Sequence, residues 1–535
     1  MPGIKILLVD GYTDDPAALG VPPYISPMVR SIAGAATDAG AAVEYVTIDK
    51  IRNGYKLPKA DVSVLLSGNT VPGRYLRSMP MSANEIKNIL PKMSGWKFIG
   101  GSSASSHAAE GFDFRIRTDP AASLYDGLNG KEVDVRLRTL DEWNRWMIIG
   151  AGIVKDHQDH PQPLTAEVET YRGCHRFTSG GCSYCIEPFK GEPLMRSPSD
   201  ILEEVAALKE SGVRNIRIGG QTCIISYGSG DLSGIPEPCP DIVNELFTQL
   251  REMRFDVLHT DNANAAVISE YPEASETVLN ILTECCTSGN VLALGMESAD
   301  PDVIRANNLN SDPEQVLAAV RMINRAGAER GENGMPELLP GLNLISGLDG
   351  ETVSTYNINK DFLRRLISEN LLIRRINIRQ VLPVRREFNT KINSKIFKKY
   401  KQEIRESIDS PMLKKIVPFG TILKRVYLEL TDNGITFGRQ IGTYPLLIGI
   451  PYKTEVNRFC DIFVTGHGFR SITGIEYPFP INTASMAAIS SLPFIGKKRA
   501  SRIVLARPIE CREQLETAID EKDVTEHLMK IITFY

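Results

Sequence analysis

The chain has 535 residues, of which 42% are hydrophobic and 24% are charged, and its formal net charge is −4. This composition excludes global disorder, supplies enough apolar material for three or four folded domains, and provides no overall positive charge for binding nucleic acid. No run of about 18 apolar residues predicts a membrane span, and the N-terminus leads directly into a strand pattern without the regions of a signal peptide. A cytoplasmic protein without membrane contact is therefore expected.

Residues 1–160 predict a doubly wound α/β domain with a parallel sheet. Apolar runs predict an amphipathic helix and four strands, at 26–39 for the helix and at 4–9, 43–48, 62–66 and 96–99 for the strands. Gly100, Gly101 and Ser103 follow the last of these strands. Because ligands bind beyond the carboxyl ends of parallel strands, these three are candidate cofactor-binding residues.

Residues 165–385 again alternate strands and helices, which predicts a full or partial (β/α) barrel with its active site at the strand carboxyl ends. Strands are expected at 216–218, 291–294, 342–345 and 376–379. The first three are followed by glycine-containing turns, Gly219-Gly220-Gln221, Gly295-Met296-Glu297-Ser298 and Gly347. A single turn of this kind is most often only a tight turn.

Cys174, Cys182 and Cys185 lie near the start of the same segment, and none of the nine cysteines precedes them. An odd number of cysteines in a reducing compartment favours buried thiols, metal ligands or catalysis over a disulfide framework. Three spaced thiolates suit an iron–sulfur cluster that leaves one iron open. A structural zinc site, which requires four ligands, and unliganded thiols remain alternatives.

The rest of the chain predicts three further segments. Residues 386–418 are rich in lysine and arginine with interleaved acidic residues, and a solvated basic linker helix is favoured over a nucleic-acid patch. Residues 420–478 change to short strands and glycine turns, which is typical of a small β-barrel. Residues 482–535 predict a helical domain that begins with two helices around Leu492-Pro493-Phe494-Ile495-Gly496.

The Thr-Tyr-Arg-Gly-Cys174 lead-in and the three spaced cysteines resemble the radical S-adenosylmethionine (SAM) superfamily, although the first two cysteines are farther apart here than is usual. The glycine-containing turns match this family in order. Gly219, Gly220 and Gln221 fall where the SAM amino group is contacted, Glu297 and Ser298 fall near its ribose and methionyl moiety, and Gly347 falls in the stretch that packs against the adenine.

The resemblance implies that Cys174, Cys182 and Cys185 bind a [4Fe–4S] cluster and that SAM chelates the open iron. One-electron reduction would then give a 5′-deoxyadenosyl radical that abstracts a substrate hydrogen. Such an enzyme needs an electron donor such as ferredoxin or flavodoxin. Arg379, on the last expected strand, is a candidate to face the same pocket, and a structural salt bridge is its alternative role.

The N-terminal segment resembles the cobalamin-binding-like domains that precede many radical SAM cores. The resemblance rests on Pro22-Pro23-Tyr24 before a helix and on Phe98-Ile99-Gly100-Gly101-Ser102-Ser103 at a strand end. The Asp-x-His-x-x-Gly motif that ligates cobalt is absent, because the residues after Asp10 read Gly-Tyr-Thr-Asp-Asp-Pro. Bound cobalamin and loss of the cofactor therefore both remain open.

Two C-terminal segments resemble nucleic-acid-binding modules. Residues 438–470 resemble a TRAM-type domain, which binds tRNA in radical SAM methylthiotransferases, and residues 492–502 resemble a helix–hairpin–helix motif. The candidate phosphate contacts are Arg439, Arg470, Lys497, Lys498 and Arg499. The whole arrangement looks like an archaeal group of radical SAM proteins with a C-terminal helix–hairpin–helix.

Two such modules beside one catalytic core predict modification of tRNA or rRNA, by methyl or methylthio transfer to an unactivated carbon. The lack of cysteines before Cys174 argues against the second cluster of methylthiotransferases and favours methylation with a cobalamin carrier. An auxiliary centre inside the core is the less favoured role of Cys223, Cys239, Cys285 and Cys286. The alternatives are a radical SAM enzyme acting on a protein or small molecule, and a non-enzymatic nucleic-acid-binding protein with a structural metal.

Overall fold

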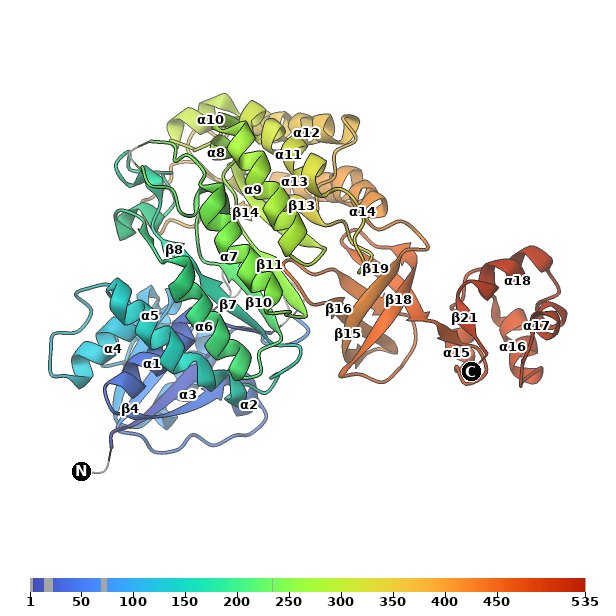
Figure 1. Ribbon diagram of the computed structural model, residues 1–535, viewed down its shortest axis with the longest axis horizontal. Helices are drawn as coiled ribbons and strands as arrows, with labels where there is room; N and C mark the ends of the chain where they lie inside the picture. Colours follow the sequence, from blue (N-terminus) through green and yellow to red (C-terminus); the bar gives the residue numbers. More distant parts are fainter. Residues whose placement is uncertain (1–2, 14–22, 69–74, 233, 535) are drawn as a thin grey trace.

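The structure is a computed structural model that describes residues 3–13, 23–68, 75–232 and 234–534 (Figure 1). Two α/β parts lie together at one end of the molecule, a small barrel adjoins the second of them, and a helical part forms the other end (Figure 1). Pro22 and residues 14–16, which entered the comparison with cobalamin-binding domains, lie outside the described residues. No described helix is both long enough and apolar enough to cross a bilayer.

The first α/β part is built on a parallel sheet of five strands in the order β3-β1-β4-β5-β6, a doubly wound order. Both faces of the sheet are covered, because Ile6 and Leu8 of β1 pack into one apolar cluster while Leu7 and Val9 pack into another. The elements are β1 (Lys5–Asp10), α1 (Pro27–Asp38), β3 (Ala42–Thr47), α2 (Ile48–Arg52), β4 (Val62–Leu66), α3 (Ala83–Ile89), β5 (Trp96–Gly100), β6 (Phe114–Arg115), α4 (Pro120–Leu128) and α5 (Leu140–Ile149).

The second α/β part, the core, contains six parallel strands that follow one another in the chain. They form two hydrogen-bonded sets, β7-β10-β11 and β12-β13-β14, joined by a parallel bridge between Ala263 and Leu294. The short strand β2 (Tyr24–Ile25), from the first part, adds to the edge beside β7. The strands are β7 (Thr165–Glu169), β10 (Asn215–Gly219), β11 (Val257–Thr260), β12 (Asn290–Glu297), β13 (Leu338–Ser346) and β14 (Arg375–Gln380).

Helices connect the core strands and cover the outside of the curved sheet (Figure 1). They are α6 (Pro198–Glu210), α7 (Pro240–Glu252), α8 (Ala265–Glu270), α9 (Pro272–Cys285), α10 (Pro301–Ala306), α11 (Pro313–Gly327) and α12 (Val353–Ser368). The expectation of an α/β chain with parallel sheets is therefore confirmed. Every strand predicted in the core is present, and each observed strand is longer than its predicted run.

A buried ion cluster fastens the two α/β parts together. Glu204 on α6 pairs with Arg30 on α1 at 2.6 Å, and its second carboxylate oxygen pairs with Arg196. All three side chains are completely buried. Because each buried charge has a partner, the contact holds α1 against the edge of the core without leaving an isolated charge in the interior.

A closed five-stranded barrel with the order β15-β16-β17-β19-β18 confirms the small β-barrel expected after residue 420. Its strands are β15 (Ile422–Asp432), β16 (Ile435–Gln440), β17 (Leu447–Ile450), β18 (Arg458–His467) and β19 (Ser471–Tyr477). The helices that follow it are α15 (Met486–Ile489), α16 (Lys497–Leu505), α17 (Arg512–Ile519) and α18 (Lys522–Met529). The C-terminal segment expected to be helical also contains a short strand, β21 (Ile532–Thr533), which pairs with β20 (Phe479–Pro480).

The basic segment before the barrel is more than a solvated linker. It forms α13 (Ser394–Ile404), a π-helical turn (Arg405–Asp409) and α14 (Ser410–Ile416). One face of this segment is buried, with Phe397, Tyr400, Ile404, Ile408 and Met412 in the main apolar cluster, while its lysines lie mainly on the other face. The spacing of these apolar residues was visible in the sequence, but the abundant lysines favoured the exposed interpretation.

Asp10, at the carboxyl end of β1, gives the first testable expectation. Burial raises its pKa to about 6, although Tyr45 and the amide of Tyr12 donate hydrogen bonds to it. A carboxyl whose pKa is raised in the folded state favours folding at low pH, and that contribution is lost as pH rises through the folded-state pKa. Between about pH 4 and pH 7, urea unfolding should show Asp10→Asn gaining about 3 kcal/mol relative to the parent protein. A pH-independent difference would contradict the shift.

Candidate active site at the carboxyl ends of the core strands

The three predicted cluster cysteines lie on one loop that follows β8 (Tyr171–Arg172) at the carboxyl end of the core. Asn308, just after α10, donates hydrogen bonds to the carbonyls of Ser179 and Gly181, and Arg176 donates to the carbonyl and side-chain oxygens of Asn308. The backbone at Gly180 and Gly181 has positive φ, 76° and 61°, a region that favours glycine. The long spacing between Cys174 and Cys182 therefore forms a loop anchored on the core.

The thiols of Cys174, Cys182 and Cys185 are close enough to influence one another. Burial is the main cause that raises the pKa of Cys182 to about 12 and that of Cys185 to about 11, and the neighbouring thiols add to both shifts. Among the described residues, no three His, Cys, Asp or Glu side chains surround a common point as ligands of a single metal ion. The loop carries three cysteines, which suits a cluster with one open iron better than a structural zinc site that requires four ligands.

Glu297 supplies an unsatisfied acceptor beside this loop. It ends β12 with φ of 62°, unusual for a residue other than glycine, and is 7% exposed. Tyr184, between the second and third cysteines, donates a hydrogen bond to the Glu297 carboxylate, and Oε2 has no partner among the described residues. A buried acceptor without a donor is costly, so this oxygen suits a ligand hydroxyl or amine.

Tyr184 was not singled out from the sequence, although its place within the cysteine motif could have indicated it. Its ring packs in a small apolar cluster with Cys182, Val303, Leu309 and Leu348. The cluster joins the cysteine loop to α10 and to the turn after β13. Tyr184 thus connects the predicted metal ligands to Glu297.

The turn after β10 is tightly packed, and the side chain of Gln221 makes its hydrogen bonds within the protein. A Cβ on Gly219 would lie 2.4 Å from the carboxylate of Glu167, and one on Gly220 would lie 2.6 Å from Cγ of Glu169. Gln221 is buried and donates to the carbonyl of Asp261 at 2.8 Å. The side chains of Glu167 and Glu169 leave no room for a Cβ at Gly219 or Gly220. The backbone of the turn is therefore the part that can face a ligand.

Of the remaining residues predicted to bind SAM, Arg379 lies near Glu297, whereas Ser298 and Gly347 bond within the protein. Burial raises the pKa of Glu297 to about 7, and the hydrogen bond from Tyr184 and the charge of Arg379 oppose this shift, so Arg379 lies near Glu297. The hydroxyl of Ser298 accepts from the amide of Asp300 and thereby caps the approach to α10, and the Gly347 amide donates to Glu351. Ser298 therefore has an internal structural role in this structure.

Gly100, Gly101 and Ser103, the candidate cofactor-binding residues of the first part, make close contacts with other residues of that part. Gly101 has φ of 80°, and a Cβ there would lie 2.4 Å from the carbonyl oxygen of Ser67. The hydroxyl of Ser103 bonds to the Ser67 hydroxyl and to the Gly68 carbonyl, and its side chain is 5% exposed. These contacts fix the carboxyl ends of β4 and β5 against each other; Gly100 lies against Pro120.

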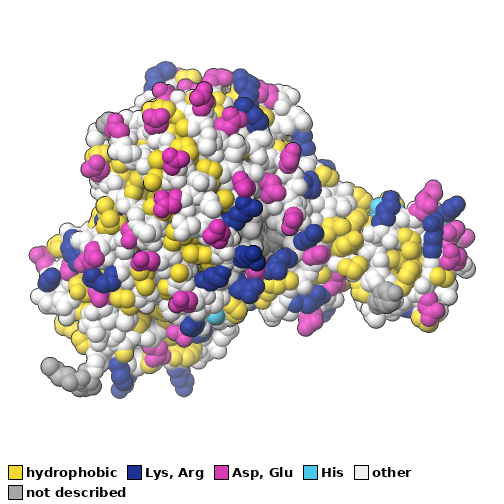
Figure 2. Space-filling model, in the orientation of Figure 1, with side chains coloured by type: hydrophobic (Ala, Val, Ile, Leu, Met, Phe, Trp, Pro, Cys, Tyr) yellow, Lys and Arg dark blue, Asp and Glu magenta, His cyan; other side chains and the backbone are white. Residues whose placement is uncertain are grey.

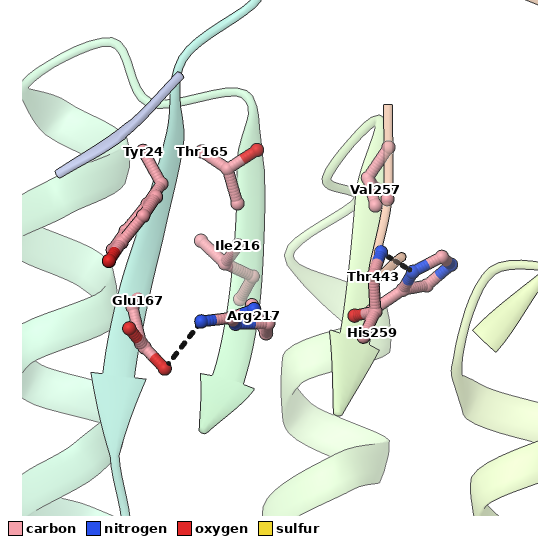
Figure 3. Close-up of a pocket in the computed structure, with 9 residues that line it drawn as sticks. Tyr24, Thr165, Glu167, Ile216, Arg217, Val257, His259 and Thr443 are labelled. Atoms are coloured by element: carbon pink, nitrogen blue, oxygen red, sulfur yellow. Dashed lines mark hydrogen bonds and ion pairs between the residues drawn. The ribbon is translucent and has the colours of Figure 1, made fainter. Parts of the chain in front are cut away.

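The opposite, amino end of the core is filled by a loop of the small barrel, a contact that the sequence did not predict. The amide of Thr443 donates to Nδ1 of His259, and Glu167 and Arg217 form an ion pair beside it (Figure 3). These residues leave a cavity of only about 10 Å³. Burial lowers the pKa of His259 to about 4, so the imidazole is neutral and its Nδ1 accepts this hydrogen bond.

Tyr444, on the same loop of the small barrel, extends toward the active-site end of the core. It is 4% exposed, and its hydroxyl reaches both carboxylate oxygens of Asp261 at 3.0 and 3.1 Å. The Arg375 guanidinium lies 4.2 Å from the centre of its ring. The Asp261 carbonyl also accepts a hydrogen bond from Gln221. Tyr444 is therefore connected through Asp261 to the turn after β10.

Arg439, predicted to contact nucleic-acid phosphate, does not face solvent. It is 2% exposed, and its guanidinium forms a two-point contact with Glu429 at 2.7 and 2.9 Å. Glu429 in turn lies 3.6 Å from Arg77 of the first α/β part. That prediction is therefore wrong, because β16 is buried on both faces between the barrel interior and the first part.

Removing this buried ion pair should cost stability. Arg439→Gln would leave the Glu429 carboxylate buried with only the more distant Arg77, so urea unfolding should show a loss of about 3 kcal/mol. Arg251→Gln, which breaks an exposed pair with Glu284, is the matched control and should change stability by less than about 1 kcal/mol. Equal effects of the two substitutions would contradict a structural role for Arg439.

The other predicted phosphate contacts are exposed to different degrees. The side chain of Arg470 is 46% exposed in the turn between β18 and β19. Lys497 and Lys498 are exposed at the start of α16. Arg499 donates to the Phe494 carbonyl and pairs with Glu521, so it stabilises the hairpin.

Comparison with known proteins places this geometry in a family. The radical SAM superfamily model matches residues 168–356, which include the three cysteines and Glu297. A Methanocaldococcus jannaschii protein, MJ0274, is 42% identical over 507 residues, covering 88% of this chain and 93% of its own length. A Clostridium botulinum tRNA-2-methylthio-N(6)-dimethylallyladenosine synthase is 22% identical over 322 residues, covering 59% of this chain and 66% of its own.

Among solved structures, the radical SAM methyltransferase TsrM from Kitasatospora setae, with cobalamin and a [4Fe–4S] cluster bound, shares 13% identity at a TM-score of 0.47. It covers 70% of this chain and 72% of its own. That likeness is too low to carry an argument about cofactor or substrate. The superfamily match and the nearly full-length match to MJ0274 are sufficient: the chain is a radical SAM enzyme and belongs to the same family as MJ0274.

Proposed function

We propose that this radical SAM enzyme modifies tRNA or rRNA and that it transfers a methyl group to an unactivated carbon. The observation that carries the proposal is the match to the tRNA-2-methylthio-N(6)-dimethylallyladenosine synthase. It spans 322 residues and therefore extends beyond the segment 168–356 that the radical SAM superfamily model matches. The closed five-stranded barrel behind the core supports the same substrate class, because small barrels commonly bind nucleic acid.

In this proposal Cys174, Cys182 and Cys185 bind a [4Fe–4S] cluster, and SAM occupies the opening beside Glu297. When bound, the cluster and SAM would supply one-electron reductive cleavage of the sulfonium and hence hydrogen abstraction from the substrate. Oε2 of Glu297, which has no hydrogen-bond partner among the described residues, would accept a hydrogen bond from SAM, and Arg379 lies near this carboxylate. The apolar cluster of Tyr184, Val303, Leu309 and Leu348 excludes water beside the cysteine loop.

Methyl transfer is favoured over methylthio transfer by the distribution of the cysteines. No cysteine precedes Cys174, so the first part has no thiols for a second cluster. Within the core, Cys223 and Cys286 are buried, and burial raises the pKa of both thiols. Cobalamin bound by the first part would carry the methyl group.

The proposal is tested by deleting the gene and comparing the modified nucleosides of tRNA and rRNA by mass spectrometry. Loss of one nucleoside is the expected result, and the mass that disappears distinguishes methyl from methylthio transfer. Complementation with the parent gene should restore the nucleoside. An unchanged profile from a strain in which the parent gene is expressed would overturn the RNA substrate and favour a protein or small molecule.

A further inference from the structure

The strongest unassigned feature is a group of cations between α13, β14 and the turn after β18. Lys401, Arg405 and Asp409 are spaced four residues apart along α13 and the π-helical turn. Arg470 reaches Asp409 from the barrel, with Nε 3.9 Å from the carboxylate. Arg374, which immediately precedes β14, completes the group and donates to the carbonyl of Tyr444.

The group has too little negative charge for its position. Asp409 is its one acidic member, its side chain is 12% exposed, and it lies close to three of the arginines. Lys401 and Arg405 have no acidic partner within ion-pair distance among the described residues. Burial and the neighbouring cations together lower the pKa of Lys401 and that of Arg374, the latter to about 9. Partly desolvated cations of like sign repel one another unless an anion joins them.

The backbone around the group is unusual in a way that fits a binding site. A single π-helical turn interrupts the helix between α13 and α14, and such turns are rare and occur frequently at functional sites. It presents Arg405 and Asp409 toward the barrel turn that carries Arg470. That turn also exposes Phe469, which is 50% accessible, beside Arg470. Arginines hold phosphate oxygens in pairs, and exposed aromatic rings stack with bases.

We propose that Lys401, Arg405, Arg470 and Arg374 form a binding site for the phosphate backbone of the substrate RNA, with Phe469 as a stacking surface for a base. This inference rests on the proposed RNA substrate and locates where that RNA is held. The site lies where the linker helix, the core and the barrel meet, so bound RNA would contact all three.

A second group of cations on the molecule shows why this one is singled out. Lys and Arg side chains also gather over the junction of core and barrel on the face shown in Figure 2. A hollow of about 510 Å³ there is lined by Arg251, Lys424 and Arg425, but also by four carboxylates. Arg251 pairs with Glu284 and Arg425 pairs with Asp256. Its charges are already balanced, and it therefore provides the control.

The test measures binding of unfractionated archaeal tRNA to the full-length protein as a function of salt. Arg405→Gln/Arg470→Gln should weaken binding about tenfold at low salt and reduce the slope of log affinity against log salt by about 1 to 2. Phe469→Ala should weaken binding with an unchanged slope. Arg251→Gln should leave both quantities as in the parent. Circular dichroism verifies that each variant is folded.

The outcomes separate this inference from the proposed function. If the parent binds tRNA and the double variant binds with equal affinity and slope, the site is wrong while the RNA substrate stands. If the parent binds neither tRNA nor rRNA at low salt, the site and the RNA substrate are both overturned, although SAM cleavage by the reduced enzyme would be unaffected. A reduced slope for the double variant alone supports the site, whichever RNA is later shown to be modified.

Discussion

Cys182→Ala is expected to give a folded protein that holds no [4Fe–4S] cluster and cleaves no detectable SAM. Cys182 is the middle of the three proposed ligands, and the cluster would be left with two thiolates. The loop is also held by contacts that do not need the Cys182 sulfur, including a hydrogen bond of 2.8 Å from Arg385 to the Cys182 carbonyl. Iron and sulfide content, visible absorbance and the formation of 5′-deoxyadenosine measure the effect.

Cys286→Ala is the matched control for this substitution. Cys286 is also largely buried, at 9% exposure, and burial raises the pKa of its thiol as well, but it lies at the end of α9, outside the cysteine loop. This variant should keep its full iron content and its SAM cleavage. The assignment of the ligands would be overturned by the reverse pattern, in which Cys182→Ala retains the cluster and Cys286→Ala loses it.

Local sequence patterns predicted the framework of the active site because the framework depends on local properties. The stretches at 216–218, 291–294 and 342–345 are strands, since parallel strands covered on both faces are rich in Val, Ile and Leu, although Arg217 and Asn343 interrupt two of them. The cysteine motif is a single loop, so its three thiols are neighbours in the chain as well as in space. Glu297 was also predicted, because the strand end that carries it is marked by glycine.

Side-chain roles that depend on distant parts of the chain were not predictable in the same way. A basic residue in a barrel strand, such as Arg439, is usually exposed, and its burial follows from Glu429 and from Arg77 of the first part. Ser298 follows Glu297 in the family motif, yet its hydroxyl caps the approach to α10. In each case the partner that decides the role lies elsewhere in the fold.

Tyr444→Ala is expected to lower the free energy of unfolding by about 4 kcal/mol, because it removes a buried aromatic ring and leaves a cavity. Tyr444 packs against Val291 and Ala293 inside the core and lies under the Arg375 guanidinium. Its loss also leaves the carboxylate of Asp261 without the tyrosine hydroxyl. Tyr444→Phe keeps the ring and removes only the hydroxyl, so its cost should be nearer 1 to 2 kcal/mol.

Tyr444→Ala should also weaken SAM binding, measured by calorimetry, by about tenfold. The physical route runs from Tyr444 to Asp261, and from the Asp261 carbonyl to Gln221, which fixes the turn after β10 where SAM is proposed to bind. Gln221 also accepts from Thr170 at the end of β7, so a displacement of Asp261 would disturb two strand ends together. Tyr444 thus acts as a positioning residue that reaches the site through another side chain.

Tyr452→Ala distinguishes this specific route from a general loosening of the barrel. Tyr452 is also 4% exposed, but it packs edge-on against Phe479 and its hydroxyl accepts from the Glu476 amide, all within the C-terminal region. The variant should lose comparable stability and keep the SAM affinity of the parent. If both variants weaken SAM equally, the barrel supports the core only by its overall stability. If Tyr444→Ala alone does so, the barrel loop is part of the catalytic core and completes it from the amino end.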